Sequence, residues 1–327
     1  MAPSYEAPPL PVSPRYAESV AVAEGPSATV SGIVWSQFFT DPALRALIAQ
    51  ALHNSRDLRL AVLRVEEARA LYGIQRSELY PVLGMSVSGT RAHTPADLSY
   101  TGQSQVASQY RAGLQVPVWE LDFWGRVRNL RDAALGEYLA TEAARRAATL
   151  SLIAQVADGY LSLRELDERL AIAQQTIDSR EESLRIFRRR YEVGATSKLD
   201  LAQVETLLTQ AQALGAQLEQ TRALQRHALM LLVGGALTEL PAGTGVGDEN
   251  LMRSRLDPGL PSDLLLRRPD IVAAEQRLRA ANANIGAARA AFFPSISLTG
   301  SYGSASAELE GLFESGSEAW SFSPSIS

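Results

Sequence analysis

The chain has 327 residues, of which 46% are hydrophobic and 20% charged, and its formal net charge is −5. This balance excludes an intrinsically disordered chain, and the negative charge argues against a general nucleic-acid-binding protein. With no cysteine and three histidines, thiol catalysis is excluded and little remains for a transition-metal site. The sequence contains no window of about eighteen consecutive apolar residues, so it predicts no transmembrane helix.

Residues 1–40 are rich in proline, serine and alanine without any period, which predicts an extended N-terminal arm. Asp41 and Pro42 predict the N-cap and first residue of a short helix that ends near His53. Residues 41–80 are expected to hold the helices of a first repeat. Apolar positions there recur at spacings of three and four, the pattern of helices that coil around neighbours: Leu58, Ala61, Val65, Ala68, Tyr72, Gln75 and Leu79.

A strand pair with an external loop is expected over residues 81–119, because the apolar period changes to two after Pro81. One face of the first strand carries Leu83, Met85 and Val87, which alternate with glycine, serine and threonine. The second strand is expected to place Ala112, Leu114, Val116 and Val118 on its apolar face.

Residues 120–233 predict a long helical hairpin whose turn lies at 191–198. No proline interrupts residues 125–191, a length that corresponds to about 100 Å of helix. The outgoing helix has a seam that consists of Leu163, Leu166, Leu170, Ala173, Ile177, Leu184, Phe187 and Tyr191. The returning helix has its own, predicted as Val204, Leu207, Ala211, Leu214, Leu218, Ala228 and Leu232, with Thr221 and Gln225 interrupting it.

A linker region over 234–262 leads to a second repeat, with a helix over 263–293 and a strand pair over 294–327. Residues 57–81 align without gaps on residues 270–294 and are identical at eight positions, which include Gly73/Gly286 and Pro81/Pro294. The apolar stripe coincides as well, as Ile271, Ala274, Leu278, Ala281, Ile285, Ala288 and Phe292. The sequence therefore predicts an internal duplication.

The hairpin turn has the sequence RRRYEVGATSKLD, residues 188–200. Gly194 is expected to adopt the left-handed conformation that ends a helix, and Ser197 with Asp200 predicts a capping box that starts the next one. Two interpretations stay open at this point: a well-capped turn with no further role, or the end of a long arm that contacts a partner.

Large aromatic residues gather where helices meet strands: Tyr80, Trp119, Phe123, Trp124, Phe292 and Phe293. We interpret them as an aromatic girdle at the edge of a membrane, and the alternative is a hydrophobic plug between sheet and helices.

Enzyme motifs are absent from the sequence, which has no GxSxG, no phosphate-binding GKS or GKT and no HExxH. The GTGVG at residues 243–247 follows no predicted strand and is interpreted as a loop. We therefore predict no catalytic residue, no cofactor, no metal and no enzymatic activity.

Three segments resemble the outer-membrane efflux channel family, the TolC-like proteins, and most of all its lipoprotein subgroup that serves resistance-nodulation-division multidrug pumps. They are LPSDLLLRRPDIVAAEQRLRAANANIGAARAAFFPSISLTGSYG at residues 260–303, PVWELDFWGRVRN at 117–129 and RYEVGATSKLD at 190–200. The resemblance extends over essentially the whole chain.

The resemblance implies an α+β membrane protein, in which long coiled-coil-like helical hairpins form a periplasmic α-barrel and join antiparallel strands of a shared trimeric transmembrane β-barrel. It implies a homotrimer in the outer membrane of a Gram-negative bacterium, in contact with its lipid and extending into the periplasm. Such a channel is a passive conduit for drugs and other small molecules from an inner-membrane pump, reached through a periplasmic adaptor. The residues that match the adaptor-contacting tip are Arg190, Tyr191, Gly194, Ala195, Thr196, Ser197, Leu199 and Asp200.

Compared with that family, the chain is expected to lack the second hairpin, the export signal and the lipidated cysteine, and so to be part of a longer protein. Four strands cannot close a barrel alone, and open strand edges are not tolerated in lipid, so assembly is expected. Two alternatives remain: a periplasmic adaptor, which also combines a helical hairpin with strands, and a coiled-coil scaffold, which explains the heptads but not the strands.

Overall fold

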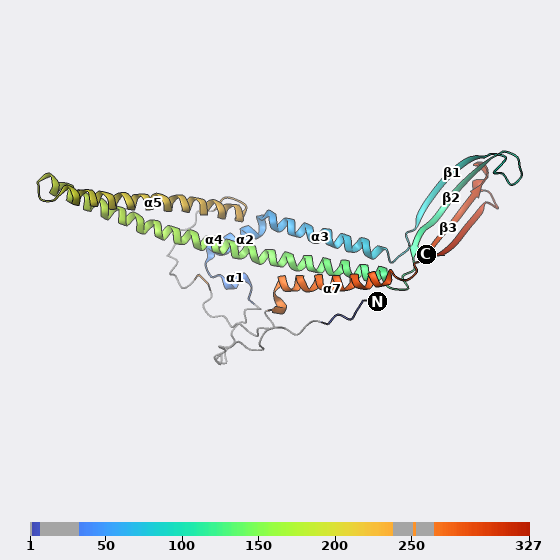
Figure 1. Ribbon diagram of the computed structural model, residues 1–327, viewed down its shortest axis with the longest axis horizontal. Helices are drawn as coiled ribbons and strands as arrows, with labels where there is room; N and C mark the ends of the chain where they lie inside the picture. Colours follow the sequence, from blue (N-terminus) through green and yellow to red (C-terminus); the bar gives the residue numbers. More distant parts are fainter. Residues whose placement is uncertain (1, 7–32, 238–250, 253–264) are drawn as a thin grey trace. The chain divides into compact units, whose positions relative to one another are not determined.

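The computed structural model describes residues 2–6, 33–237, 251–252 and 265–327 (Figure 1). These form two compact units. The first contains the described residues within 1–9, 64–142 and 272–327, and the second those within 10–63 and 143–271. Most of the predicted linker region lies outside the described residues, and so does the GTGVG segment.

The first unit holds one antiparallel sheet of four strands in the order β1-β2-β3-β4 (Figure 1). The strands are β1 Gly84–Thr94, β2 Gln105–Glu120, β3 Ile296–Ser306 and β4 Glu318–Ile326. Each predicted strand pair forms a hairpin, and the pairing of β2 with β3 joins the two repeats.

The two faces of this sheet differ in chemistry. On one face the register aligns Met85, Leu114, Tyr302 and Trp320 in a row across all four strands, and all four side chains are exposed. On the other face, hydroxyl pairs link β3 to β4: Ser301 to Ser321 and Ser297 to Ser325, each with 2.7 Å between the Oγ atoms. We call these the apolar face and the hydroxyl face.

The register of β2 against β3 shifts between Val116 and Trp119. Pro117 lies in this β-bulge, which suits a residue that has no N–H for the ladder. The bulge places Trp119 opposite Leu298, so the prediction that the apolar alternation of β2 continues to Val118 is wrong.

In the same unit, the first part of α4 (Arg126–Glu192) contacts both α3 (Arg56–Ser77) and α7 (Pro269–Ala290), of which all but the N-terminal residues belong to this unit. Tyr72 of α3 stacks on Tyr138 of α4, with 6.4 Å between the ring centroids. On the other side, a Cβ placed on Gly136 would lie only 2.9 Å from Cβ of Ala280, so α4 and α7 approach closely through small residues. The side chains of this contact are Ala133, Ala280 and Ala283.

The seam predicted for α3 is confirmed, because all of its members are partly buried. The equivalent stripe of α7 is not packed: Leu278, Ile285 and Phe292 are exposed in the described chain. α7 instead buries a face of alanine and glycine. It contacts α4 with this face, whereas α3 contacts α4 with its apolar stripe. Within the described chain, the two repeat helices therefore contact α4 through different faces.

Residues 2–6 run along α7. The amide Nδ2 of Asn282 donates a hydrogen bond to the carbonyl oxygen of Pro3 at 2.9 Å, and the guanidinium of Arg279 lies 5.2 Å from the ring centroid of Tyr5. Of the predicted extended arm, residues 7–32 lie outside the described residues. Trp35–Phe38 form the one-turn helix α1, so the arm prediction is wrong there: the carbonyl of Val34 accepts hydrogen bonds from Gln37 N and Phe38 N.

The second unit is built from α2 (Pro42–Asn54), α5 (Lys198–Val233) and the second part of α4. Their main core consists of Leu44, Leu47, Ile48, Ala51, Ile153, Val156, Ala157, Tyr160, Leu163, Leu229 and Val233. The predicted N-cap is confirmed: Asp41 Oδ1 accepts hydrogen bonds from Ala43 N at 2.7 Å and Leu44 N at 3.3 Å.

The predicted seam of α4 is confirmed as far as Phe187, whereas that of α5 is partly wrong. Leu207, Leu214 and Ala228 are exposed, whereas the other predicted members are covered: Val204, Ala211, Leu218 and Leu232. They share the contact line of α5 with Leu208, Gly215, Arg222, Leu229 and Val233. Gly215 permits this line, because a Cβ there would lie 3.0 Å from Ile177 Cδ1. Arg222 takes part by donating a hydrogen bond to Asp167 of α4.

Candidate functional site

The turn between α4 and α5 ends the first helix with a complete Schellman motif. Gly194 has φ +72°, its N–H donates to the carbonyl of Tyr191 at 3.0 Å, and Ala195 N–H donates to that of Arg190 at 2.8 Å. No atom lies within 4 Å of the position of a Cβ on Gly194. Glycine is therefore required there by the backbone conformation and not by crowding.

Asp200 organises the start of α5. Its Oδ2 accepts hydrogen bonds from Ser197 Oγ at 2.7 Å, from Thr196 Oγ1 at 3.0 Å and from Ser197 N at 3.2 Å. Ser197 Oγ accepts in turn from Asp200 N at 3.1 Å, so the predicted capping box is confirmed. The Ser197 hydroxyl and backbone bonds lower the pKa of the Asp200 carboxyl below its ordinary value. The turn is therefore held rigidly by its own side chains.

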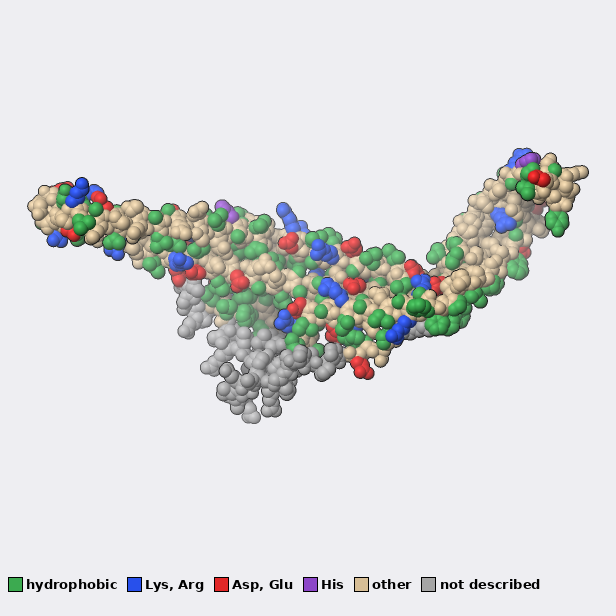
Figure 2. Space-filling model, viewed as in Figure 1, with side chains coloured by type: hydrophobic (Ala, Val, Ile, Leu, Met, Phe, Trp, Pro, Cys, Tyr) green, Lys and Arg blue, Asp and Glu red, His purple; other side chains and the backbone are tan. Residues whose placement is uncertain are grey.

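The rigid turn presents apolar side chains that nothing in the described chain covers. Leu199 is 68% exposed and Val193 is 67% exposed, while Tyr191 is less so. Figure 2 shows hydrophobic, basic and acidic side chains together at this end of the hairpin. We call residues 190–200 the tip.

The eight predicted tip residues divide into two groups. Thr196, Ser197 and Asp200 are joined by hydrogen bonds, and Gly194 and Ala195 form the turn; Arg190 lies over the ring of Phe187, 5.4 Å from its centroid. Tyr191 and Leu199 point to solvent instead. Sequence reasoning missed Val193. This apolar residue comes just before the glycine that ends the helix and does not belong to the predicted seam, which was a usable signal of an exposed apolar side chain.

The junction aromatics also divide. Trp124 stacks on Phe293 with 4.9 Å between the ring centroids, and its Nε1–H donates to the carbonyl oxygen of Pro294 at 2.9 Å. This pair joins the start of α4 to the segment after α7, and both side chains stay partly open, with Trp124 37% and Phe293 44% exposed. Tyr80, Phe123 and Phe292 are exposed, and Trp119 is partly buried, with an Nε1 that has no hydrogen-bond partner in the described structure.

Polar residues fix where β2 passes into α4. Arg126 donates to both carboxylate oxygens of Glu120, at 2.9 and 2.5 Å, so the charge of Glu120 is balanced. Asp122 accepts from Val127 N at 3.1 Å and Arg128 N at 2.8 Å, which caps the helix. Burial raises the pKa of Asp122, but these backbone bonds outweigh it and leave the pKa below its ordinary value.

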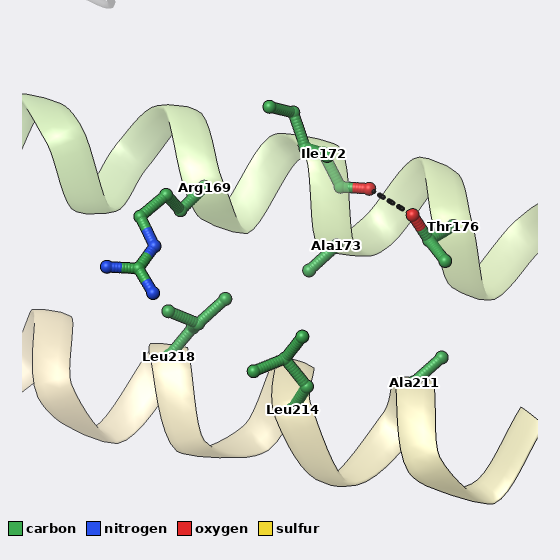
Figure 3. A pocket seen from close by; sticks show the side chains of 7 residues that line it. All are labelled: Arg169, Ile172, Ala173, Thr176, Ala211, Leu214 and Leu218. Carbon is green, nitrogen blue, oxygen red and sulfur yellow. Dashed lines mark hydrogen bonds between the residues drawn. The ribbon is translucent and has the colours of Figure 1, made fainter. Parts of the chain in front are cut away.

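A shallow groove of about 210 Å³ lies between α4 and α5 (Figure 3). Ala173, Leu214 and Leu218 face one another across it, and Thr176 donates to the carbonyl of Ile172 at 2.9 Å. Arg169 is its one charged lining residue, so the groove lacks an acid–base pair.

The described residues provide no ligand set for a metal ion, because they contain no group of three or more His, Asp or Glu side chains placed to hold one. Within the same ranges, no helix combines the length and the apolar character needed to cross a membrane.

The family model "Outer membrane efflux protein" matches residues 47–235 and 260–327. The outer membrane protein OprJ of Pseudomonas aeruginosa is 45% identical over 331 residues, covering 100% of this chain and 68% of OprJ. The toluene efflux pump outer membrane protein TtgI of Pseudomonas putida is 49% identical over 292 residues, covering 89% of this chain and 62% of TtgI. The chain thus spans roughly two thirds of the length of these relatives.

Solved structures agree with these matches. A membrane protein from Pseudomonas aeruginosa is 44% identical and superposes with a TM-score of 0.90, covering 100% of this chain and 73% of the other. The open state of the MtrE outer membrane channel of Neisseria gonorrhoeae is 41% identical, with a TM-score of 0.87, covering 100% and 72%.

Proposed function

Because the chain belongs to the outer membrane efflux protein family, we propose that the whole protein is the outer-membrane channel of a tripartite efflux system. The predicted family, the predicted outer-membrane location and the predicted fold class of long helical hairpins joined to antiparallel strands are confirmed by these matches. The alternatives, a periplasmic adaptor and a coiled-coil scaffold, do not account for them.

The two-faced sheet is the observation that carries the channel proposal. β1, β3 and β4 contain 11, 11 and 9 residues, which matches the length of strands that cross a bilayer at a tilt. The apolar face carries exposed Met, Leu, Tyr and Trp side chains, and the hydroxyl face carries serine and threonine. We assign the apolar face to lipid and the hydroxyl face to a water-filled duct.

Assembly is required by the edges of the sheet. β1 and β4 each have a strand partner on one side only, and unpaired backbone groups are costly in hydrocarbon. In the proposed homotrimer, each edge pairs with a strand of a neighbouring copy, so that the ring has no edge. The exposed aromatics Tyr80, Phe123 and Phe292 then lie at the boundary between lipid and periplasm, together with Trp119. The stacked and also exposed pair Trp124 and Phe293 lies at the same boundary.

The helices provide the periplasmic part. In this proposal residues 120–233 form a duct wall, and the tip contacts the helical hairpins of a periplasmic adaptor, which connects the channel to an inner-membrane pump. The support is the rigid turn with its uncovered Val193 and Leu199. The channel is then a passive conduit, and the choice of compounds rests largely with the pump.

Export from cells tests the proposal. The whole protein is expressed with its pump and adaptor in a strain that lacks its own channel, and drug susceptibility and adaptor cross-linking are measured. We expect Leu199→Ser to reduce export severalfold while trimers persist, because it removes an exposed apolar contact without touching the turn. Gly194→Val or Asp200→Lys should do the same by deforming the turn.

Leu224→Ser is the matched control, since Leu224 is an exposed leucine on the shaft of the same helix. It should export like the unaltered protein. Full export by the three tip variants would refute the adaptor assignment, and absence of export by the unaltered protein would refute the channel proposal itself.

A further inference from the structure

The hydroxyl face of the sheet carries a single cationic side chain, Arg111 of β2. The register places Arg111 directly opposite Ser88 on β1 and Ala305 on β3, with Gly113 two residues along its own strand. These three neighbours are small, and the larger neighbour on this face is Gln109, two residues the other way along β2. Arg111 is exposed, and no hydrogen bond or ion pair connects it to any residue that the structure describes.

Other charges on the strands do not cancel it. Glu120 belongs to the same face by its register with Ser297, but Arg126 already pairs with it. Arg91 and Glu318 lie on the apolar face, opposite Ser108 and Ser304. In the described β3–β4 connection, Glu308, Glu310 and Glu314 form no ion pair with Arg111.

We propose that Arg111 determines charge selectivity in the strand-lined part of the duct, where the three copies in a trimer favour anionic over cationic solutes. This inference rests on the proposed function, because it requires that the hydroxyl face lines the water path. Physically, three fixed positive charges on a surface of hydroxyl groups, none of them ion-paired with a described carboxylate, create a positive potential at that surface. Such a potential raises the local concentration of anions and lowers that of cations.

The potential can be measured with a thiol placed beside Arg111. The chain has no cysteine, so Ser88→Cys introduces a single reactive group directly across from Arg111. The whole protein is kept as a membrane-embedded trimer and treated with small methanethiosulfonate reagents, one anionic and one cationic. The ratio of the two reaction rates reports the local potential.

We expect Arg111→Gln to lower the anionic-to-cationic rate ratio by roughly threefold to tenfold at moderate salt, from the Coulomb interaction of a unit charge about 6 Å away with ionic screening. At about 1 M salt the difference should nearly vanish, because the screening length falls to about 3 Å. Arg111→Lys keeps the charge and should keep the ratio.

Two matched controls accompany the test. Arg91→Gln removes the same charge from the opposite face of the sheet and should leave the ratio at Ser88→Cys unchanged. In a second variant the single cysteine is Ser325→Cys, on the hydroxyl face of β4 opposite Ser297 and far from Arg111. Adding Arg111→Gln to this variant should leave its anionic-to-cationic rate ratio unchanged.

The outcomes separate the two proposals. If the thiol reacts with both reagents and Arg111→Gln leaves the ratio unchanged, Arg111 has no selectivity role and the channel assignment stands. If the thiol is closed to both charged reagents, or if Arg91→Gln changes the ratio in place of Arg111→Gln, the hydroxyl face does not line the duct. Both proposals then fail.

Discussion

The contact between Asp41 and Tyr160 shows how one residue connects segments that are distant in sequence. Asp41 uses one carboxylate oxygen to cap α2 and the other to accept a hydrogen bond from the Tyr160 hydroxyl at 2.7 Å. Tyr160 is almost completely buried in the core of α2, α4 and α5. The cap could be predicted because Asp-Pro is a local signal, whereas its partner lies 119 residues away and carries no local sign.

We expect Tyr160→Phe to destabilise the protein by about 1–3 kcal/mol, because it removes a hydrogen bond to a charged group and leaves the ring in place. The midpoint of heat denaturation of the detergent-purified protein measures the effect. Tyr191→Phe, at the exposed tip, should be neutral. Equal midpoints for the two variants would show that the hydroxyl contact contributes nothing.

The same contact predicts a dependence on pH. Burial, and then the hydrogen bond to Asp41, raise the pKa of Tyr160 from 10.0 to about 12. Below pH 10 the phenol is neutral in both folded and unfolded states, so its contribution is complete. Between pH 10 and 12 the unfolded state ionises first, and the contribution is lost. Tyr160→Phe should therefore flatten the fall of stability in that window, and an unchanged slope would contradict a raised pKa of Tyr160.

At the scale of elements, the two repeat helices use equivalent residues differently. Gly73 and Gly286 occupy the same position in the repeat, yet no atom lies within 4 Å of a Cβ on Gly73. A Cβ on Gly286 would lie 2.7 Å from both the backbone N of Ala2 and Asn129 Oδ1. The same residue therefore has a steric role only in α7.

This pair supplies its own control. Gly73→Ala should stabilise the protein by about 0.5–1 kcal/mol, since alanine favours an exposed helix. Gly286→Ala should destabilise it by about 1–3 kcal/mol, because a crowded site must shift. Heat denaturation measures both, and proteolysis near residues 2–6 should increase only for Gly286→Ala. Parallel behaviour of the two variants would contradict the packing of residues 2–6 on α7.

Periodicity predicted the helices, the strands and the duplication because each of these is a local pattern. It could not predict which face of a repeated helix meets which neighbour. Glycine and alanine carry no apolar signal, so the buried face of α7 was invisible beside Leu278 and Ile285. The same limit applies to Gly215, which moves the contact line of α5 away from Leu214. At the tip, local capping signals predicted the turn, whereas exposure of Val193 required the structure.

For the whole molecule, the two repeat helices leave complementary faces uncovered. α3 packs on α4 through its predicted stripe, whereas α7 buries a different face, which contains Ala283, Gly286 and Ala287. The positions of α3 that correspond to these three are Ala70, Gly73 and Ile74, and all of them are exposed. Conversely, the apolar stripe with which α3 packs corresponds in α7 to Leu278, Ile285 and Phe292, which are exposed. A helix like α4 fits each uncovered face, which is the condition for extending the row of helices into a closed ring.

If a neighbouring copy covers α3 in the proposed trimer, Ile74→Glu should impair assembly. Ile74 is 62% exposed in the single chain, and burying an unpaired carboxylate in its place should cost on the order of 3 kcal/mol per copy. Val62→Glu is the matched control, because Val62 is exposed on α3 between its two packing faces. Heat-resistant trimer on gels should fall at least tenfold for Ile74→Glu and stay constant for Val62→Glu. Equal trimer yields would show that the uncovered face of α3 meets water in the assembled channel, and the ring of helices would have to close through other residues.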